Sequence, residues 1–442
     1  MTRRQALVDA AALVLARALL SFVAIRLGFD HVSDDDFARV TIAQEFAHAP
    51  KLDPTGTSWL PLPFWLLGAV MMVLGRSLTV ARVASVLFAA LATPLPYLAM
   101  RRGGVARRDA LLGVTMATLC PWSVWLGAAT VPEAMAASLV SAGAIGLGLS
   151  GRERGGDDTR STALWLACVA GACLSRYEAW PVAGTIAAAS VVGAWRAGPG
   201  AARRRALVVA ALASAAPFAW MAWNAHAHDG PLHFFRRVSS YKRAMGEGTT
   251  DTLAALAMYP ILLITTATGV SVPALLGLGR REVTRTWATP LACAAVAIAM
   301  LAYGNVRDGA PTHHPERALL VPLHLLGPFA AAALGPVVLA TRRGRAAIAF
   351  AFVVWGAFLV RAMAWRAPAQ AADEDRAPQV ARGRELARRG VTALSLEPCA
   401  YEHYALIAGY GAPERVHVPR ERALPTRTPD ARCPEVRVDA AP

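Results

Sequence analysis

Long apolar segments joined by short connectors constrain this chain more than any other feature. An α-helix needs roughly 20 apolar residues to cross the hydrocarbon core of a membrane. Composition agrees, because 17% of the residues are charged, against about 25% in an average soluble domain. The sequence therefore predicts an all-α polytopic membrane protein of about eleven spans. The predicted spans are Ala6–Phe29, Arg82–Met100, Ala110–Val131, Ala134–Ser150, Ser161–Ser175, Ala179–Trp195, Ala206–Ala225, Thr252–Gly279, Thr286–Val306, Ala318–Thr341 and Ala346–Trp365.

Arginine is concentrated in every second connector between these spans. Since Lys and Arg accumulate in cytoplasmic loops, we predict a cytoplasmic N-terminus and a C-terminus on the outer side. The same clustering explains the formal charge of +15 without a nucleic-acid partner, and we expect none. The basic connectors are those around Arg101–Arg108, Arg152–Arg160, Arg196–Arg205, Arg280–Arg285 and Arg342–Arg345.

The apolar segment Trp59–Gly75 is nearly long enough to be a further span. If it crossed the membrane, every later basic connector would move to the outer side, against the charge rule. We therefore predict an interfacial or re-entrant helical segment, anchored by Trp59 and the prolines that come after it.

These patterns divide the chain into a transmembrane domain, residues 1–365, and an outer C-terminal domain, residues 366–442. Residues 30–81 form the first outer loop of the transmembrane domain. We expect a small α/β fold in the C-terminal domain, with a disulfide between Cys399 and Cys433; two free thiols are the alternative. The other four cysteines lie in apolar segments and are predicted to be core residues.

Three consecutive acids, Asp34, Asp35 and Asp36, come after the first predicted span. Neighbouring carboxylates at a membrane surface are suited to act as a general base or to hold a divalent cation through oxygen ligands. The alternative is a solvated acidic helix start, because Asp is frequent in the first turn of a helix. We interpret this triplet as the catalytic candidate.

Other polar groups lie in later outward connectors. His313, His314, Glu316 and Arg317 precede a long span. The histidines and the arginine are suited to a phosphate, or to anchoring the helix at the interface. Lys242 and Arg243 come after an aromatic segment, and we expect them to bind a lipid phosphate or anionic headgroups. Arg176 and Glu178 lie between two spans and are interpreted as an ion pair. No P-loop or dinucleotide motif is present.

The order of several short motifs resembles a known family. They are the acidic pair in the first outer loop, Trp59–Leu62, Ala81–Arg82, Arg176–Glu178, Gly230–Phe234, and Glu316–Arg317 before Pro322. This pattern resembles the GT-C glycosyltransferases of family 39 type, which use polyprenyl-phosphate sugars and include protein O-mannosyltransferases and bacterial aminoarabinose transferases. Protein mannosyltransferases generally carry Asp-Glu where this chain has Asp-Asp-Asp. Asp35 followed by Asp36 fits the family pattern best, because an aromatic residue comes next.

The resemblance implies a GT-C-like bundle and an inverting sugar transfer on the outer face. Asp35 or Asp36, with Asp34 beside them, would be the base, and Arg317, His313, His314, Lys242 and Arg243 would steady the lipid phosphate. Trp59, Arg176, Glu178 and Glu316 would support the site. The implied partners are a polyprenyl-phosphate sugar, membrane lipids and an envelope lipid, glycan or protein as acceptor. No cofactor is assigned, and a divalent metal stays open. Ala- and Arg-rich usage indicates a bacterial inner membrane.

Two other classes of function compete with the enzyme. A transporter or flippase would show inverted repeats or paired broken helices near mid-membrane, and the sequence shows neither. A membrane scaffold is suggested by the C-terminal tail alone. The gathering of polar residues in the outward connectors favours the glycosyltransferase.

Overall fold

The computed structural model describes residues 3–56, 58–149, 159–244, 251–309, 314–364, 375–397, 401–418 and 437–440. The predicted site residue His313 and the predicted disulfide partners Cys399 and Cys433 lie outside these ranges. The helices are α1 (Arg3–Arg26), α2 (Asp35–His48), α3 (Leu62–Leu74), α4 (Leu78–Ala92), α5 (Pro94–Arg102), α6 (Arg107–Thr118), α7 (Pro121–Ala128), α8 (Glu133–Leu149), α9 (Thr159–Cys173), α10 (Ala179–Arg196), α11 (Ala201–Ala227), α12 (His233–Ala244), α13 (Thr252–Thr266), α14 (Thr268–Leu278), α15 (Arg281–Thr286), α16 (Ala288–Val306), η2 (Pro315–Leu319), α17 (Leu320–Val338), α18 (Arg342–Ala364), α19 (Ala377–Arg388), α20 (His403–Tyr410) and η3 (Pro413–Arg415). The strands are β1 (Leu394–Glu397), β2 (Val416–His417) and β3 (Arg437–Ala440).

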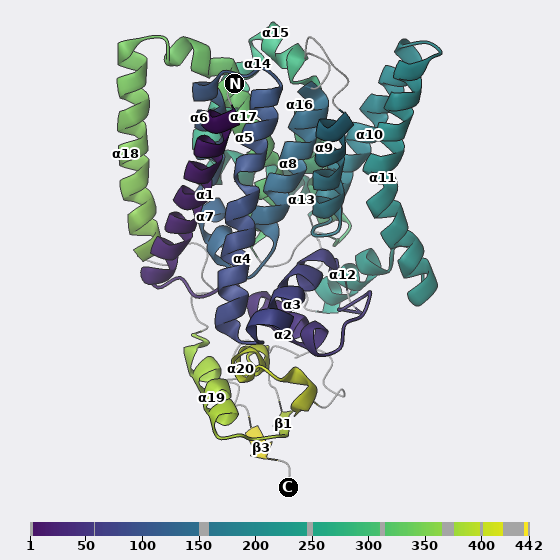
Figure 1. Ribbon diagram of the computed structural model, residues 1–442, viewed down its shortest axis with the longest axis vertical. Coiled ribbons are helices and arrows are strands. Elements are labelled where there is room, and N and C mark those ends of the chain that lie inside the picture. Colours follow the sequence, from purple (N-terminus) through teal and green to yellow (C-terminus); the bar gives the residue numbers. More distant parts are fainter. Residues whose placement is uncertain are drawn as a thin grey trace.

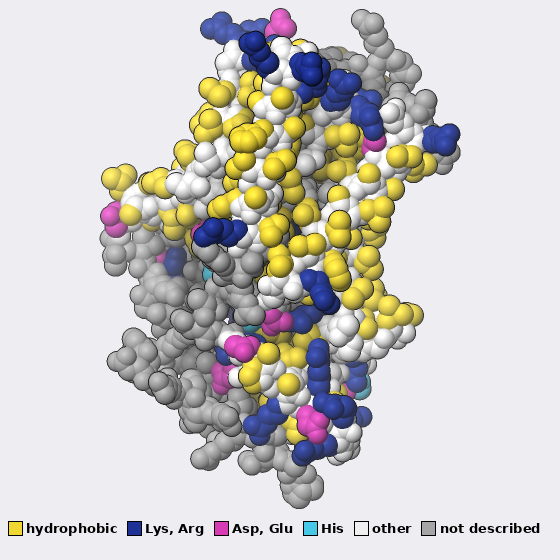
Figure 2. Space-filling view, turned by 90° about the vertical axis from the view of Figure 1, so that its left-hand side faces the viewer, with side chains coloured by type: hydrophobic (Ala, Val, Ile, Leu, Met, Phe, Trp, Pro, Cys, Tyr) yellow, Lys and Arg dark blue, Asp and Glu magenta, His cyan; other side chains and the backbone are white. Residues whose placement is uncertain are grey.

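The molecule is a bundle of apolar helices with a smaller unit at one end (Figure 1). Among the described residues, six helices are long and apolar enough to cross a membrane, or up to eight if each of two bent pairs is one span. The predicted spans at α8, α9 and α10 are shorter helices of 17, 15 and 18 residues. A broad belt of hydrophobic side chains covers the middle of the molecule, and Lys and Arg side chains gather above and below it (Figure 2). The prediction of an all-α polytopic membrane protein is confirmed.

Two of the predicted spans are sharply bent, which contradicts our expectation of no broken helices. The pair α6–α7 bends by 73° and the pair α13–α14 by 103°. Pro121, at the start of α7, explains the first bend because it lacks an N–H and disfavours helical geometry in the preceding residue. Arg17 of α1 donates to Thr118 O across this break at 3.4 Å, and Trp355 of α18 donates to Leu119 O at 2.8 Å. Protein side chains therefore satisfy the carbonyls that the bend exposes.

Helices α2 and α3 lie at the opposite end of the bundle from the N-terminus (Figure 1). The 13 residues of α3 span about 20 Å at 1.5 Å per residue, which is less than the roughly 30 Å of a hydrocarbon core. The segment Trp59–Gly75 therefore forms a helix too short to cross the membrane by itself, and its interfacial placement stays a prediction. Gly68 allows α3 to approach α2 closely, because a Cβ there would collide with Phe46.

The C-terminal unit packs against α2. Its strands are ordered β2-β1-β3, with β1 parallel to β2 and antiparallel to β3. Val380 of α19 and Ala405 and Ala408 of α20 share a hydrophobic cluster with Phe37 of α2. At the same contact, the Gln44 side-chain amide donates to Ala408 O at 3.0 Å. The unit is thus attached directly to the helix that begins with the acidic triplet.

Candidate functional site

The acidic triplet forms the start of α2. Asp34 is the N-cap residue, and Asp35 and Asp36 lie in the first turn. An N-cap Asp usually accepts a hydrogen bond from a backbone N–H of that turn. The Asp34 side chain makes no such capping bond. Each of the three carboxylates instead binds a different part of the chain.

Asp36 is buried, with 3% of its surface exposed. One carboxylate oxygen accepts from Val32 N at 3.0 Å, and the other accepts from Thr130 N at 2.9 Å and from the Thr130 hydroxyl at 3.1 Å. Asp36 therefore fixes the entry to α2 against the corner between α7 and α8. Its hydrogen-bonding capacity is used by the protein itself.

Asp34 pairs with Arg376, the N-cap residue of α19 in the C-terminal unit. Arg376 Nε lies 2.8 Å from Oδ1 of Asp34, and Nη2 lies 2.9 Å from Oδ2. This two-point geometry is the strongest form of an arginine–carboxylate contact.

Asp35 contacts Arg317, the buried arginine of η2. Arg317 Nη1 lies 3.2 Å from Oδ2 of Asp35. The Asp35 side chain is 43% exposed, whereas that of Asp34 is 15% exposed. Asp35 is therefore the member of the triplet that an incoming molecule can reach most easily. The structure thus places these two predicted site residues in contact, and their joint role stays a prediction.

Arg317 also belongs to a buried ion network. Its Nε and Nη2 donate to Oε1 of Glu133, the first residue of α8, at 3.0 and 2.6 Å. Arg176 Nη1 approaches the same oxygen at 3.3 Å, and Arg176 Nε donates to Glu178 at 3.0 Å. The predicted Arg176–Glu178 pair thus forms one side of the network.

The charges of this network support one another. Burial raises the pKa of Glu133, but Arg176, Arg317 and Arg39 outweigh burial and lower it to about 2, so the group is ionised. Buried ions are costly unless their bonds are complete. Yet Oε2 of Glu133 is buried without a hydrogen-bond partner in the described part of the chain. The network therefore combines strong charge pairing with one carboxylate oxygen whose hydrogen bonding is incomplete.

Arg39 lies on α2, four residues after Asp35, and is 3% exposed. Its guanidinium lies 4.5 Å from the ring centre of Trp59 and 5.7 Å from that of Phe64. Burial lowers the pKa of Arg39 to about 10, although Glu133 and Asp35 oppose the shift. Its Nε is buried and has no hydrogen-bond partner among the residues that the structure describes. The predicted supporting residue Trp59 therefore holds a second cation near the network.

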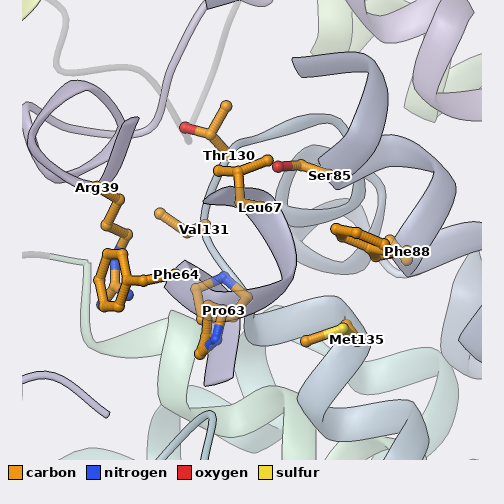
Figure 3. Close-up of a pocket in the computed structure, with 11 residues that line it drawn as sticks. Arg39, Pro63, Phe64, Leu67, Ser85, Phe88, Thr130, Val131 and Met135 are labelled. Atoms are coloured by element: carbon orange, nitrogen blue, oxygen red, sulfur yellow. The ribbon is translucent and has the colours of Figure 1, made fainter. Parts of the chain in front are cut away.

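An apolar pocket begins beside Arg39 and lies between α2, α3, α4 and α8 (Figure 3). It contains about 430 Å³ of unoccupied space, its open mouth included. Its shape is thus a groove more than a closed chamber. The lining residues are Arg39, Pro63, Phe64, Leu67, Ser85, Phe88, Ala89, Thr130, Val131, Pro132 and Met135.

The remaining predicted phosphate-binding residues have other contacts. Lys242 of α12 is buried and donates to the Asn305 side chain at 3.1 Å, and Arg243 donates to Ser239 O at 3.2 Å. His314 lies 5.4 Å from Trp122, ring centre to ring centre. None of these three contacts is with a member of the Asp35–Arg317 network. Glu316 is half-buried next to Arg317.

Helix α12 is nevertheless linked to the network through aromatic stacking. Phe234 of α12 stacks on Tyr177 with ring centres 4.1 Å apart. Tyr177 lies between Arg176 and Glu178 in the chain. The basic helix therefore packs on the corner that carries one side of the ion network.

The described residues contain no group of three or more His, Cys, Asp or Glu side chains placed to hold a metal ion. The carboxylates of Asp34, Asp35 and Glu133 face arginines, and that of Asp36 faces backbone and hydroxyl donors. Apart from Oε2 of Glu133, the oxygens described above already bind cationic or neutral donors of the protein, so this set of carboxylates does not fit a metal as it is arranged.

Together, the fold and the site define a multi-pass helical membrane protein with a charged cluster where the start of α2 meets the bundle. A scan of protein-family models and a search of curated proteins find no match for this chain. The solved structures do contain similar folds. The chain is similar to the crystal structure of ArnT from Cupriavidus metallidurans in the apo state, with a TM-score of 0.56 and 16% sequence identity over 91% of this chain and 75% of that one.

The crystal structure of the same ArnT bound to undecaprenyl phosphate is similar too, with a TM-score of 0.53, 14% identity and the same coverage. At this level of identity the likeness shows the fold. The chain therefore has the fold of these ArnT structures, in agreement with the helical bundle that the resemblance implied.

Sequence analysis missed two members of the network, Glu133 and Arg39. Glu133 had a usable signal, because an acid directly before an apolar helix is costly without a partner. Arg39 had a weaker one, since Asp35 and Arg39 have the spacing that places two residues on one helix face. Neither signal identifies Arg317 or Trp59 as the contact, because those contacts depend on the tertiary fold.

Proposed function

We propose that this protein transfers a sugar from a polyprenyl-phosphate donor to an acceptor at the outer face of a bacterial inner membrane, with Asp35 as the general base. The observation that carries the proposal is the contact between the exposed carboxylate of Asp35 and the buried Arg317. The fold supports it, because a structural neighbour of the same architecture was solved with undecaprenyl phosphate.

In the proposed reaction, an acceptor hydroxyl or amine attacks the anomeric carbon of the donor sugar. A new bond forms between the acceptor atom and that carbon, and the acceptor proton passes to the Asp35 carboxylate. The bond from the anomeric carbon to the phosphate oxygen breaks, and its electron pair leaves with the lipid phosphate. Attack opposite the leaving group inverts the configuration. Arg317 orients Asp35 and offers positive charge where negative charge develops on the phosphate.

The groove beside Arg39 supports a placement for the donor. Its apolar wall of Phe64, Leu67, Phe88 and Met135 suits the first isoprene units of a polyprenyl chain. Arg39 would then face the phosphate at the polar end of the groove. Its incomplete hydrogen bonding favours such an anionic partner.

The proposed orientation places the N-terminus in the cytoplasm and the C-terminal unit in the periplasm. In Figure 1, the N-terminus and α15 lie at the end opposite the C-terminal unit. The basic connectors support a cytoplasmic assignment for the upper end. Labelling of single cysteines with a membrane-impermeant maleimide tests this, and a label on a residue of α15 in intact spheroplasts would contradict it.

The test of the enzyme combines gene deletion with Asp35→Asn. Mass spectrometry of envelope glycolipids and glycoproteins should show a sugar that is missing in the deletion strain and restored by the wild-type gene. When D35N and wild-type protein are present in the membrane in equal amounts, we expect D35N to restore about 10²–10⁴-fold less of this sugar. General base catalysis contributes a factor of that size.

Asp251→Asn is the matched control for D35N. Asp251 caps α13 by accepting from Leu253 N and Ala254 N, and Asn is an equally good N-cap. We expect D251N to behave as wild type. Full transfer by D35N would refute its role as base, and an envelope unchanged by the deletion would refute the glycosyltransferase itself.

A lipid flippase is the second candidate, and the two bent helix pairs are the observation that favours it. Against it, the first break is filled by Arg17, and Ser123 at the same place lies 3.3 Å from Nε2 of His324. If the deletion strain accumulates lipid-linked sugar whose sugar still faces the cytoplasm, the flippase is favoured. If it accumulates with the sugar exposed there, the transferase is favoured.

A further inference from the structure

Two arginine–carboxylate pairs fasten the C-terminal unit to the first outer loop. One joins Arg376 to Asp34. The other joins Arg76, just before α4, to Glu414 of η3, with distances of 2.8 and 3.0 Å. The two pairs have the same two-point chemistry. They differ in place, because only the first includes a member of the acidic triplet.

The Arg376–Asp34 pair is also the better shielded of the two. Its side chains are 10% and 15% exposed, whereas those of Arg76 and Glu414 are 27% and 21% exposed. An ion pair with less access to water is less screened and holds its geometry more firmly. Asp34 is the N-cap residue of α2, but its side chain binds the C-terminal unit and not the backbone of its own helix.

The Arg376–Asp34 pair also affects Asp35, because Asp34 and Asp35 are adjacent in the chain. The orientation of the Asp34 backbone therefore sets that of the next residue. Asp36 fixes the same turn from the bundle side through Thr130. The exposed carboxylate of Asp35 is thus held between one anchor in the transmembrane bundle and one anchor in the C-terminal unit.

We infer that Arg376 is a positioning residue of the site: through Asp34 it holds the start of α2 so that Asp35 faces Arg317. The inference rests on the proposed function, because it gives the C-terminal unit a part in orienting the proposed base. Arg376 itself does not touch the reacting atoms in this arrangement. A displacement of about 1 Å in a reacting group can lower a rate about a hundredfold, so a modest loosening is measurable.

The test compares five variants of the full-length protein in nanodiscs and in the complemented deletion strain: Arg376→Gln, Arg376→Lys, Asp34→Asn, the double variant of Arg376→Gln and Asp34→Asn, and Arg76→Gln as matched control. Hydrogen exchange needs no substrate. We expect R376Q and D34N to speed exchange at the start of α2, while α19 and α20 keep their protection. R76Q should leave the start of α2 unchanged.

Sugar transfer should show the same division. We expect R376Q and D34N each to lower the restored sugar about tenfold to a hundredfold. The double variant should lose no more than either single variant, because both remove one interaction. Arg376→Lys should recover part of the loss, since it keeps the charge but not the two-point geometry. R76Q should transfer as wild type.

Several outcomes would overturn the inference. Equal effects of R376Q and R76Q would mean that both pairs only attach the C-terminal unit. Additive losses in the double variant would mean that Arg376 acts by a route other than Asp34. Normal transfer by R376Q together with loss by D35N would remove the positioning role and leave the proposed function intact. No transfer by the wild-type protein would instead refute the proposed function, and exchange at α2 would still decide whether Arg376 orders that turn.

Discussion

Two buried carboxylates of this protein are bound by arginine, one near each end of the bundle, and they differ in how complete their bonding is. Asp9 of α1 uses both oxygens: Arg107 donates to Oδ2 and Oδ1 at 2.8 and 2.6 Å, and Tyr97 donates to Oδ2 at 2.5 Å. Glu133 binds Arg317 and Arg176 through one oxygen, and its second oxygen has no partner among the described residues. We interpret the fully bonded cluster at Asp9 as a structural link between helices, and the incompletely bonded cluster at Glu133, beside Asp35, as part of the proposed site.

Neutralising Glu133 gives the largest expected effects on stability and transfer among the changes that test this comparison. Glu133→Gln leaves buried arginines without their counter-ion, so we expect a loss of about 3–5 kcal/mol in the free energy of unfolding. Transfer per folded molecule should fall as well, because Arg317 loses its orientation. Unfolding in detergent and envelope mass spectrometry measure the two effects.

Asp9→Asn is the counterpart at the other end. It should lower the unfolding temperature less, because the Arg107 side chain is 45% exposed and can turn to water. Transfer per folded molecule should stay at the wild-type level. If D9N impaired transfer as much as E133Q, the division between structural and functional clusters would be wrong.

Low pH should reduce the stability that the ionised Glu133 gives to the fold. The pKa of Glu133 is lowered from 4.5 to about 2 in the folded protein, so its ionised form stabilises the fold. That contribution is complete above pH 4.5 and is lost as the pH falls through 2. We therefore expect the unfolding temperatures of wild type and E133Q to converge as the pH is lowered through this window. A constant difference between them would contradict the assignment.

A third prediction concerns Arg39, the other incompletely bonded group of the site. Arg39→Gln should weaken the binding of undecaprenyl phosphate about tenfold, the usual effect of removing one charged hydrogen bond. Native mass spectrometry of the protein in nanodiscs measures the change. Arg82→Gln is the control, because Arg82 already pairs with Asp30. Equal binding by R39Q and wild type would move the donor away from the groove.

The smallest expected effect is at Thr130, which anchors Asp36. Thr130→Val removes the hydroxyl that donates to Asp36 but keeps the shape of the side chain. We expect a loss of about 1 kcal/mol in the free energy of unfolding and a modest decrease in transfer. Thr130→Ser should behave nearly as wild type. A larger effect on transfer than that of D35N would mean that Asp36, and not Asp35, is the important acid.

The sequence predicted the class of fold, because the length of apolar segments is a local property. It did not distinguish the three aspartates, which are identical in type and adjacent. Their difference comes from Arg376, Arg317 and Thr130, which are remote in the chain. Pro121 could have warned of the first bend, whereas the second, near Ala267, has no breaker at its own position.

The three acids of the triplet make the beginning of α2 intolerant of changes in length. Each residue added to a helix rotates the neighbouring part of the helix by about 100°. An insertion between Asp36 and Phe37 would rotate all three carboxylates relative to the rest of α2 and away from their arginines and threonine, whereas a substitution disturbs only one. Variants that shift this register should therefore be far more damaging than any single replacement, even when the added residue is alanine.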